Sequence, residues 1–316
     1  MGNRGTGLGG QTKAAIDTQV RLAAFRFLEE QVRIHGEVLP RNVLIKGFEF
    51  GGERVCLITR QGIFTPRILK YPLSFYTTPP SLGKTRPYDD ELGENGVIKY
   101  RYRGEDPNHR DNVGLRKCQE MGLPLIYLYG IVPGEYLPVW PVFIVGDDSA
   151  HLTFSVAVDD RRVITDKDWI IKGAESEAKR RYITVETQYR LHQHSFRKRV
   201  LMAYHERCAI CRLHHAELLE AAHIVSDKHP LGEPIIPNGL ALCKLHHAAF
   251  ERNILGISPD YVIDIRRDIL EEIDGPMLKY GLQQIRGQVI QTPRVNDFKP
   301  SRELLAIRFD EFRKAG

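Results

Sequence analysis

Side chains that bind metals or transfer protons are concentrated in one stretch of the chain, from Cys208 to Glu251. Seven of the 12 histidines fall between His205 and His247, and three of the five cysteines lie in the same window. Thiolates and imidazoles bind transition metals, and a neutral imidazole also accepts protons near neutral pH. This stretch is therefore where we expect reactive chemistry.

Four residues in the stretch have the spacing of a zinc clamp: Cys208, Cys211, Cys243 and His246. They form two pairs, each with two intervening residues, and 31 residues separate the pairs. Two loops of this kind can surround one tetrahedral ion, so the pattern predicts a closed, structural zinc site. The alternative is three buried, free cysteines in a reduced protein.

A second set of residues is interleaved with the first: His223, Asn238, His247 and Glu251. His247 and Glu251 are four residues apart, which places them on one face of a helix, where an imidazole and a carboxylate can share a divalent ion. His223 follows an apolar run and is expected to end a strand, in a position to activate a water. The alternative for each residue alone is an ordinary surface or core group.

This stretch resembles the HNH nucleases, also called the ββα-metal family, over residues 204–265, through the segments AAHI, PNGLALC and LHHAAFER. The resemblance implies that His223 is the general base and that Asn238 braces the loop that carries it. It also implies that His247, together with Glu251, binds a catalytic divalent cation such as Mg²⁺ or Mn²⁺. The sequence departs from many members of the family at Ala222, where they carry a metal-binding Asp or His.

The length and composition of the chain are those expected of an ordinary soluble, globular protein. Its 316 residues suffice for two domains, 42% are hydrophobic and 27% are charged. No apolar run approaches the roughly 20 residues needed to span a bilayer, so we expect a cytoplasmic protein with no membrane partner. The net charge of +5 favours a polyanionic partner. Five cysteines, an odd number, do not indicate a disulfide framework.

The N-terminal half is expected to be of α+β type. Apolar residues recur at helical spacing over 13–35, and Asp111–Glu120 is a second candidate helix. Short runs rich in β-branched and aromatic residues predict strands at Arg54–Thr59, Val97–Arg103, Leu125–Ile131, Val139–Val145 and Leu152–Val158. These strands suggest a compact, curved β-sheet or barrel.

Within this half, acids and tyrosines precede and follow a basic strand. A carboxylate can accept a hydrogen bond from a cytosine amino group, and aromatic rings can stack on an extruded base. The segments Tyr-Asp-Asp, Tyr-x-Tyr-x-Gly and Asp-Asn-x-x-Leu resemble an SRA domain of the SRA/PUA-like fold, a reader of modified cytosine, over roughly residues 50–160. The resemblance implies a base pocket that contains Tyr88, Tyr102 and either Asp89 or Asp90. The alternative is that the tyrosines are half-buried sheet residues.

We divide the chain into a base-reading domain with an N-terminal helix (1–165), a linker (166–188) and a nuclease domain (189–316). Basic residues near the start of the nuclease domain can lie along DNA phosphates, or they can form a solvated helix face; they include Arg190, Arg197 and Lys198. After Glu251 we expect a strand at Tyr261–Ile265 and helices around Ile269–Leu282 and Ser301–Arg313, with Ser301 capping the last helix.

The order of the two domains resembles modification-dependent restriction endonucleases. The resemblance implies double-stranded DNA with a modified cytosine as substrate, and 5′-phosphate and 3′-hydroxyl ends as products. Cutting both strands requires two centres, so a homodimer is expected. The alternatives are a zinc-clamped DNA-binding protein with an inactive centre and an HNH nuclease that reads an unmodified sequence. An RNA nuclease is a remoter alternative.

Overall fold

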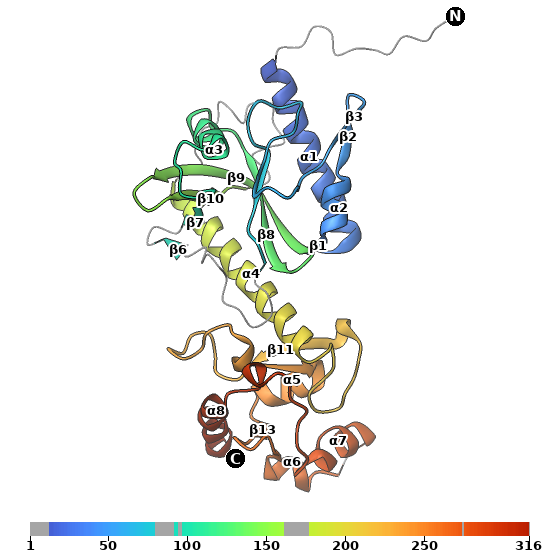
Figure 1. The fold of residues 1–316 in the computed structure, drawn as a ribbon. Helices are drawn as coiled ribbons and strands as arrows, with labels where there is room; N and C mark the ends of the chain where they lie inside the picture. The colour runs from blue at the N-terminus through green and yellow to red at the C-terminus, as the bar shows by residue number, and fades with distance from the viewer. Residues whose placement is uncertain (1–12, 80–91, 94–96, 161–176, 274, 316) are drawn as a thin grey trace, which may run out of the picture. The chain divides into compact units, whose positions relative to one another are not determined.

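A computed structural model (Figure 1) describes residues 13–79, 92–93, 97–160, 177–273 and 275–315. The chain divides into two compact units, Met1–Leu191 and His192–Gly316. Each unit is described below by itself. Among the described residues, no helix combines the length and the apolar character required to cross a bilayer.

A curled sheet of eight strands forms the centre of the first unit. Its strand order is β4-β5-β8-β9-β10-β7-β6, and β1 pairs with β9. Neighbouring strands are antiparallel except β5 and β8, which run parallel. The strands are β1 (Leu39–Pro40), β4 (Ile63–Phe64), β5 (Ser74–Tyr76), β6 (Leu92–Gly93), β7 (Val97–Arg101), β8 (Leu125–Val132), β9 (Glu135–Asp148) and β10 (Thr153–Val158).

The central strand β8 reads LIYLYGIV, and every one of its residues is buried. Such a continuous apolar run is typical of a strand that is covered on both faces. Helix α1 (Lys13–His35) contributes Val20, Ala24 and Leu28 to the same hydrophobic core, and none of these three side chains is exposed. Helix α3 (Arg110–Glu120) contacts β9.

The predictions for this unit are largely confirmed. The helix over 13–35, the helix at Asp111–Glu120 and four of the five strands are present. The strand predicted at Arg54–Thr59 was wrong in its extent, because only Glu53–Val55 (β3) is a strand. It pairs with β2 (Phe48–Phe50) in a hairpin outside the main sheet. Thus the α+β class and the curved sheet are correct.

Helix α4 (Glu177–Ala203) includes the last residues of the predicted linker, 177–188. Of the range 166–188, the part up to residue 176 lies outside the described residues, and the remainder is helical. The residues of α4 that are buried recur every three or four positions, and they include the polar Thr184, Gln188 and Ser195. Thr184 accepts a hydrogen bond from the backbone N–H of Val158 at 2.9 Å, so this part of α4 is held by the first unit.

The second unit is built around a hairpin followed by a helix. Strand β11 (Leu219–His223) pairs antiparallel with β12 (Gly239–Cys243), and helix α5 (Lys244–Glu251) follows β12 directly. The later strands and α-helices are β13 (Leu255–Ile257), β14 (Ile263–Ile265), α6 (Arg267–Glu271), α7 (Pro276–Gly281) and α8 (Arg302–Lys314). Ser301 caps α8 as predicted, since its hydroxyl accepts from the N–H of Leu304. The helix predicted around Ile269–Leu282 is two short helices, α6 and α7.

Candidate active site

His223 is the last residue of β11, opposite Gly239 in the hairpin. The chain that follows it is held by Asn238, which has no exposed surface. The Asn238 carboxamide accepts from the N–H of Val225 at 2.9 Å and donates to the carbonyls of Val225 and Glu233, both at 3.0 Å. A buried amide with these three bonds fixes the path of the backbone beyond His223. Asn238 therefore lies where the predicted brace was expected.

The imidazole of His223 stacks on the ring of Phe196 from α4, with centroids 4.0 Å apart and planes 14° apart. Its Nε2 is buried and has no hydrogen-bond partner among the described residues. Burial lowers the pKa of His223, the charge of Asp227 opposes this, and the charge of His247 lowers it further. A neutral ring with an unsatisfied, fixed nitrogen is suited to accept a proton from a ligand or water.

Gly239 leaves the space that this stacking needs. A Cβ at this position would lie 2.4 Å from Cγ2 of Val200 and 3.0 Å from Cζ of Phe196. We expect Gly239→Ala to destabilise the second unit by about 1–3 kcal/mol, because overpacking forces neighbouring side chains to move. Cleavage should fall more than DNA binding, since the moved ring is the one that supports His223. Chemical denaturation and single-turnover cleavage measure the two effects.

Gly275→Ala is the matched control, because a Cβ there meets nothing within 4 Å. That control should retain both stability and cleavage. A Gly239→Ala protein as stable and as active as the wild type would show that the packing around His223 is looser than described.

Helix α5 carries two adjacent histidines that point in different directions. Consecutive helical residues are about 100° apart around the axis, so His246 turns into the core while His247 stays partly exposed. Nε2 of His247 lies 3.2 Å from a carboxylate oxygen of Glu251, one turn later. The predicted pair on one helical face is therefore present. The two side chains offer a nitrogen and an oxygen donor, which suit a divalent cation.

Glu220 is a candidate functional residue that the sequence reasoning missed. Its carboxylate forms a short hydrogen bond with Nδ1 of His247. A carboxylate at Nδ1 fixes the proton there and leaves the Nε2 lone pair free to bind a metal. Glu220 lies on β11, three residues before His223, and its side chain is 41% exposed. Ala222, at the position where many HNH nucleases carry a metal-binding Asp or His, is fully buried.

We expect Glu220→Gln to weaken the affinity of the catalytic cation by roughly 10- to 100-fold, the usual effect of losing an orienting carboxylate. The measurement is the concentration of Mn²⁺ at half-maximal cleavage, with zinc content as the control for an intact fold. An unchanged Mn²⁺ dependence would mean that Glu220 does not orient His247.

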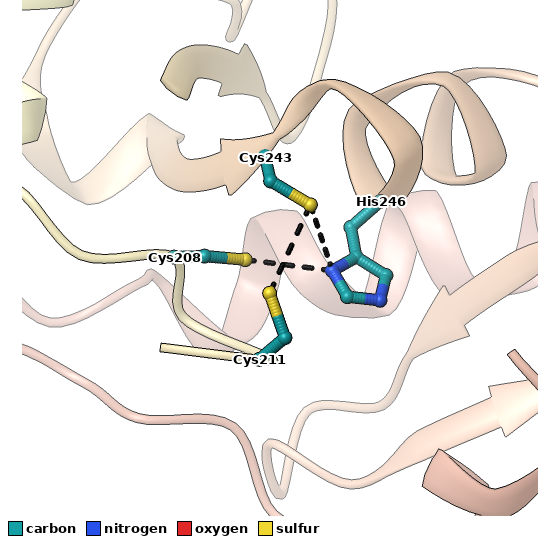
Figure 2. A group of neighbouring side chains, drawn as sticks. All are labelled: Cys208, Cys211, Cys243 and His246. Atoms are coloured by element: carbon teal, nitrogen blue, oxygen red, sulfur yellow. Dashed lines mark hydrogen bonds between the residues drawn. The ribbon is translucent and has the colours of Figure 1, made fainter. Parts of the chain in front are cut away.

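The four residues of the predicted zinc clamp converge at one point, with all ligand atoms within 4.8 Å of one another (Figure 2). Nδ1 of His246 lies 3.5 Å from Sγ of Cys208 and 3.2 Å from Sγ of Cys243, and Sγ of Cys211 lies 3.9 Å from that of Cys243.

The tautomer of His246 fits a metal site. Its Nε2 is 2.9 Å from the carbonyl oxygen of Gly281, to which it donates its proton, so the lone pair of Nδ1 faces the three sulfurs. Hydrogen bonds from Cys211 and Cys243 lower the pKa of the Cys208 thiol, and the thiolate is the form that binds metal. The Cys₃His group could therefore bind a structural zinc ion.

This hairpin, helix and cluster lie within a stretch that matches a known family. Residues 208–258 match the HNH endonuclease family. The chain carries an HNH endonuclease domain. This domain match supports a metal-dependent DNA endonuclease. No curated protein matches the chain.

Two solved structures of restriction enzymes resemble the chain only weakly. One is titled a modification-dependent TagI restriction endonuclease; it is 16% identical over 76% of this chain and 81% of that chain, with a TM-score of 0.27. The other is titled the type IV phosphorothioation-dependent restriction endonuclease ScoMcrA; it is 15% identical over 96% of this chain and 64% of that chain, with a TM-score of 0.26. With TM-scores this low, neither alignment bears on the fold or the substrate.

The three basic residues predicted to contact DNA phosphates already have partners within the chain. Arg190 pairs with Glu186 at 2.7 Å, and Lys198 lies 4.0 Å from Glu206. Arg197, at the entry to the HNH domain, donates to the carbonyls of Ala216 at 3.0 Å and Leu219 at 2.9 Å. Arg197 therefore holds the chain that enters β11, and phosphate binding by this residue remains a prediction.

The predicted base pocket is only partly visible. Tyr88, Asp89 and Asp90 lie outside the described residues. Tyr102 is 6% exposed; its ring stacks on Phe154 at 4.5 Å, and its hydroxyl donates to Asp147. Burial raises the pKa of the Tyr102 hydroxyl, as does the hydrogen bond to Asp147. Tyr102 is therefore packed against β10, and one face of its ring is already covered.

Proposed function

We propose that this protein is a modification-dependent, type IV-like restriction endonuclease. The first unit binds duplex DNA and accepts a flipped, modified cytosine (5-methylcytosine or a related base), and the HNH domain hydrolyses the backbone. The observation that carries the nuclease half is the fixed imidazole of His223, with its buried and unsatisfied Nε2, in the same domain as the His247–Glu251 pair. The reader half is supported by the SRA-like sequence segments and by a curled sheet of the expected type.

In the proposed reaction, His223 takes a proton from the water that attacks the scissile phosphate. Phe196 and Asn238 keep the imidazole in place, so the ring needs no reorientation during the reaction. His247 and Glu251 hold a divalent cation, which would stabilise the negative charge that develops on the phosphate. The products are 5′-phosphate and 3′-hydroxyl ends.

The Cys₃His cluster has a structural role in this proposal. Cys208 and Cys211 are on the loop before β11, whereas Cys243 and His246 join β12 to α5. A zinc ion bound by all four would fix α5, and with it His247, against the rest of the domain. Thiolate clusters of this type persist where thiols are kept reduced, which supports a cytoplasmic site of action.

The proposal includes a homodimer, since one HNH centre cuts one strand at a time. Light scattering on the full chain, alone and with DNA, measures this directly. If the protein stays monomeric on DNA and only nicks it, the homodimer is ruled out and the nuclease assignment is unaffected.

The test of the proposed function is digestion of one plasmid prepared with cytosine, 5-methylcytosine, 5-hydroxymethylcytosine, N6-methyladenine or phosphorothioate linkages, each with Mg²⁺ or Mn²⁺. We expect cleavage of a plasmid with modified cytosine and little cleavage of the unmodified plasmid. Equal cleavage of all plasmids would favour a nuclease that reads an unmodified sequence. Binding without cleavage on every plasmid would favour a DNA-binding protein with an inactive centre, to which Ala222 would be the first clue.

A further inference from the structure

A groove of about 840 Å³ lies in the second unit, outside the predicted active site. It is bordered by the end of α4, by the loop that carries Cys208, and by the segment 289–294. Four of its lining side chains are basic, namely His205, Arg207, Arg212 and Arg294, and no acidic residue lines it. A groove with one sign of charge concentrates ligands of the opposite sign.

The charges in this groove are not neutralised within the protein. Arg207 and Arg294 are exposed, and in the described part of the chain neither side chain makes a hydrogen bond or an ion pair. The nearest acid in sequence, Glu206, lies 4.0 Å from Lys198. By contrast, the guanidinium groups of Arg266 and Arg267 are paired with Asp268 and Glu271. The groove thus keeps its positive charge for a ligand.

Residues that line the groove are hydrogen-bonded to the loop that carries Cys208. The N–H of Gln291 donates to the carbonyl of Ala209 at 2.7 Å, and the N–H of Arg212 donates to the carbonyl of Cys208 at 3.0 Å. The Gln291 carboxamide, with its oxygen turned toward Arg212, accepts from that guanidinium at 2.8 and 2.9 Å. The arginine is therefore oriented before a ligand arrives, which reduces the entropy lost on binding.

We propose that this groove binds the sugar-phosphate backbone of duplex DNA and so holds the substrate on the HNH domain. The proposal rests on the proposed function for the identity of its ligand. Arginine forks match phosphate oxygens in a bidentate geometry. Contacts to phosphates position a protein on DNA without reading its sequence, so the groove should act on modified and unmodified duplexes alike. Arg207 and Arg294 are the phosphate ligands, and Arg212 adds charge from a fixed position.

The test uses the full chain with His223→Ala, so that bound DNA is not cut, and an unmodified duplex as the probe. Dissociation constants are measured over a range of salt concentrations for Arg207→Gln/Arg294→Gln. Each lost phosphate contact reduces the magnitude of the slope of log Kd against log salt by roughly 0.9. For the double variant we therefore expect a slope smaller in magnitude by about two and an affinity lower by roughly 10- to 100-fold. Arg266→Gln/Arg267→Gln is the matched control; it removes the same charge from paired arginines and should leave the slope unchanged.

Arg207→Lys/Arg294→Lys keeps the charge and should restore the salt slope, which separates charge from a folding defect. The proposal is overturned if the glutamine variant and its His223→Ala parent share one salt slope, or if that parent does not bind the duplex. The proposed function is judged separately, by plasmid cleavage in the presence of His223. If the protein with His223 cleaves the plasmid but the glutamine variant shows an unaltered salt slope, the groove proposal is wrong and the nuclease assignment stands. If the salt slope is reduced but no plasmid is cleaved, the groove proposal stands and the nuclease assignment is wrong.

Discussion

Replacement of His223 by alanine is expected to lower the rate of DNA cleavage by roughly 10²- to 10⁴-fold, the usual contribution of a positioned general base. The imidazole is held by its stacking on Phe196, and its Nε2 has no hydrogen-bond partner among the described residues, so its removal takes away a proton acceptor and one ring contact but no hydrogen bond of Nε2. DNA binding and thermal stability should therefore change little. Single-turnover kinetics measure the cleavage rate, equilibrium binding measures the affinity for DNA, and thermal denaturation measures the stability.

His214→Ala is the control for the loss of a histidine near the same hairpin, because His214 is exposed and belongs to neither predicted ligand set. It should cleave at the wild-type rate. Cleavage by His223→Ala at the same rate as His214→Ala would exclude His223 as the base.

The lowered pKa of His223 sets the expected pH dependence of DNA cleavage. Burial lowers the pKa of His223 below the ordinary value of 6.5, so the neutral, base-competent form persists to more acidic pH in the folded protein. The rate of the chemical step should stay constant as the pH is lowered to 6.5 and should fall only below pH 6.5. The unfolded chain takes up this proton more readily, so His223 also makes the folded state less stable as the pH falls through that range. An acidic limb above pH 6.5 would contradict the assignment.

The second large effect is expected at the zinc cluster. Cys243→Ser should remove bound zinc, unfold the second unit and abolish cleavage. The reason is the scale of the energies, since structural zinc contributes on the order of 10–16 kcal/mol in small domains, as much as the whole stability of many proteins. Cys243 and His246 join β12 to α5, so loss of the ion would also release the helix that carries His247.

Metal analysis and circular dichroism measure this effect, and Cys56→Ser is the control. Cys56 is half-buried in the first unit and distant in sequence from the cluster. We expect one zinc ion per chain in the wild type and in Cys56→Ser, and none in Cys243→Ser. Zinc retained by Cys243→Ser at the wild-type level would show that the cluster is not the metal site.

The parts of this structure that could be predicted are those in which a short spacing fixes the geometry. The pairs Cys208–Cys211 and Cys243–His246 are each close in sequence, and the ion that they suit requires them to meet. His247 and Glu251 are one helical turn apart, so helix geometry alone brings them to 3.2 Å. The helix over 13–35 is continuous in its apolar period, and it is present from Lys13 to His35.

The parts that could not be predicted depend on contacts between distant segments. Glu220 is 27 residues before His247, and only the pairing of β11 with β12 brings its carboxylate to the histidine. Phe196 is an apolar residue of α4, but its stacking on His223 is a contact between segments distant in sequence. Residues 177–188 of the predicted linker are helical, and their buried positions include Thr184 and Gln188, which carry no hydrophobic period.

Cleavage of duplex DNA by the zinc-loaded full chain, with and without added Mg²⁺ or Mn²⁺, is the most direct test of the claim that His223 and the His247–Glu251 pair form a working hydrolytic centre. We predict strand scission only with the added cation, with 5′-phosphate and 3′-hydroxyl ends and with no scission by His247→Ala. DNA that stays intact on every modified substrate, although the folded protein binds it and carries its zinc, would contradict the account.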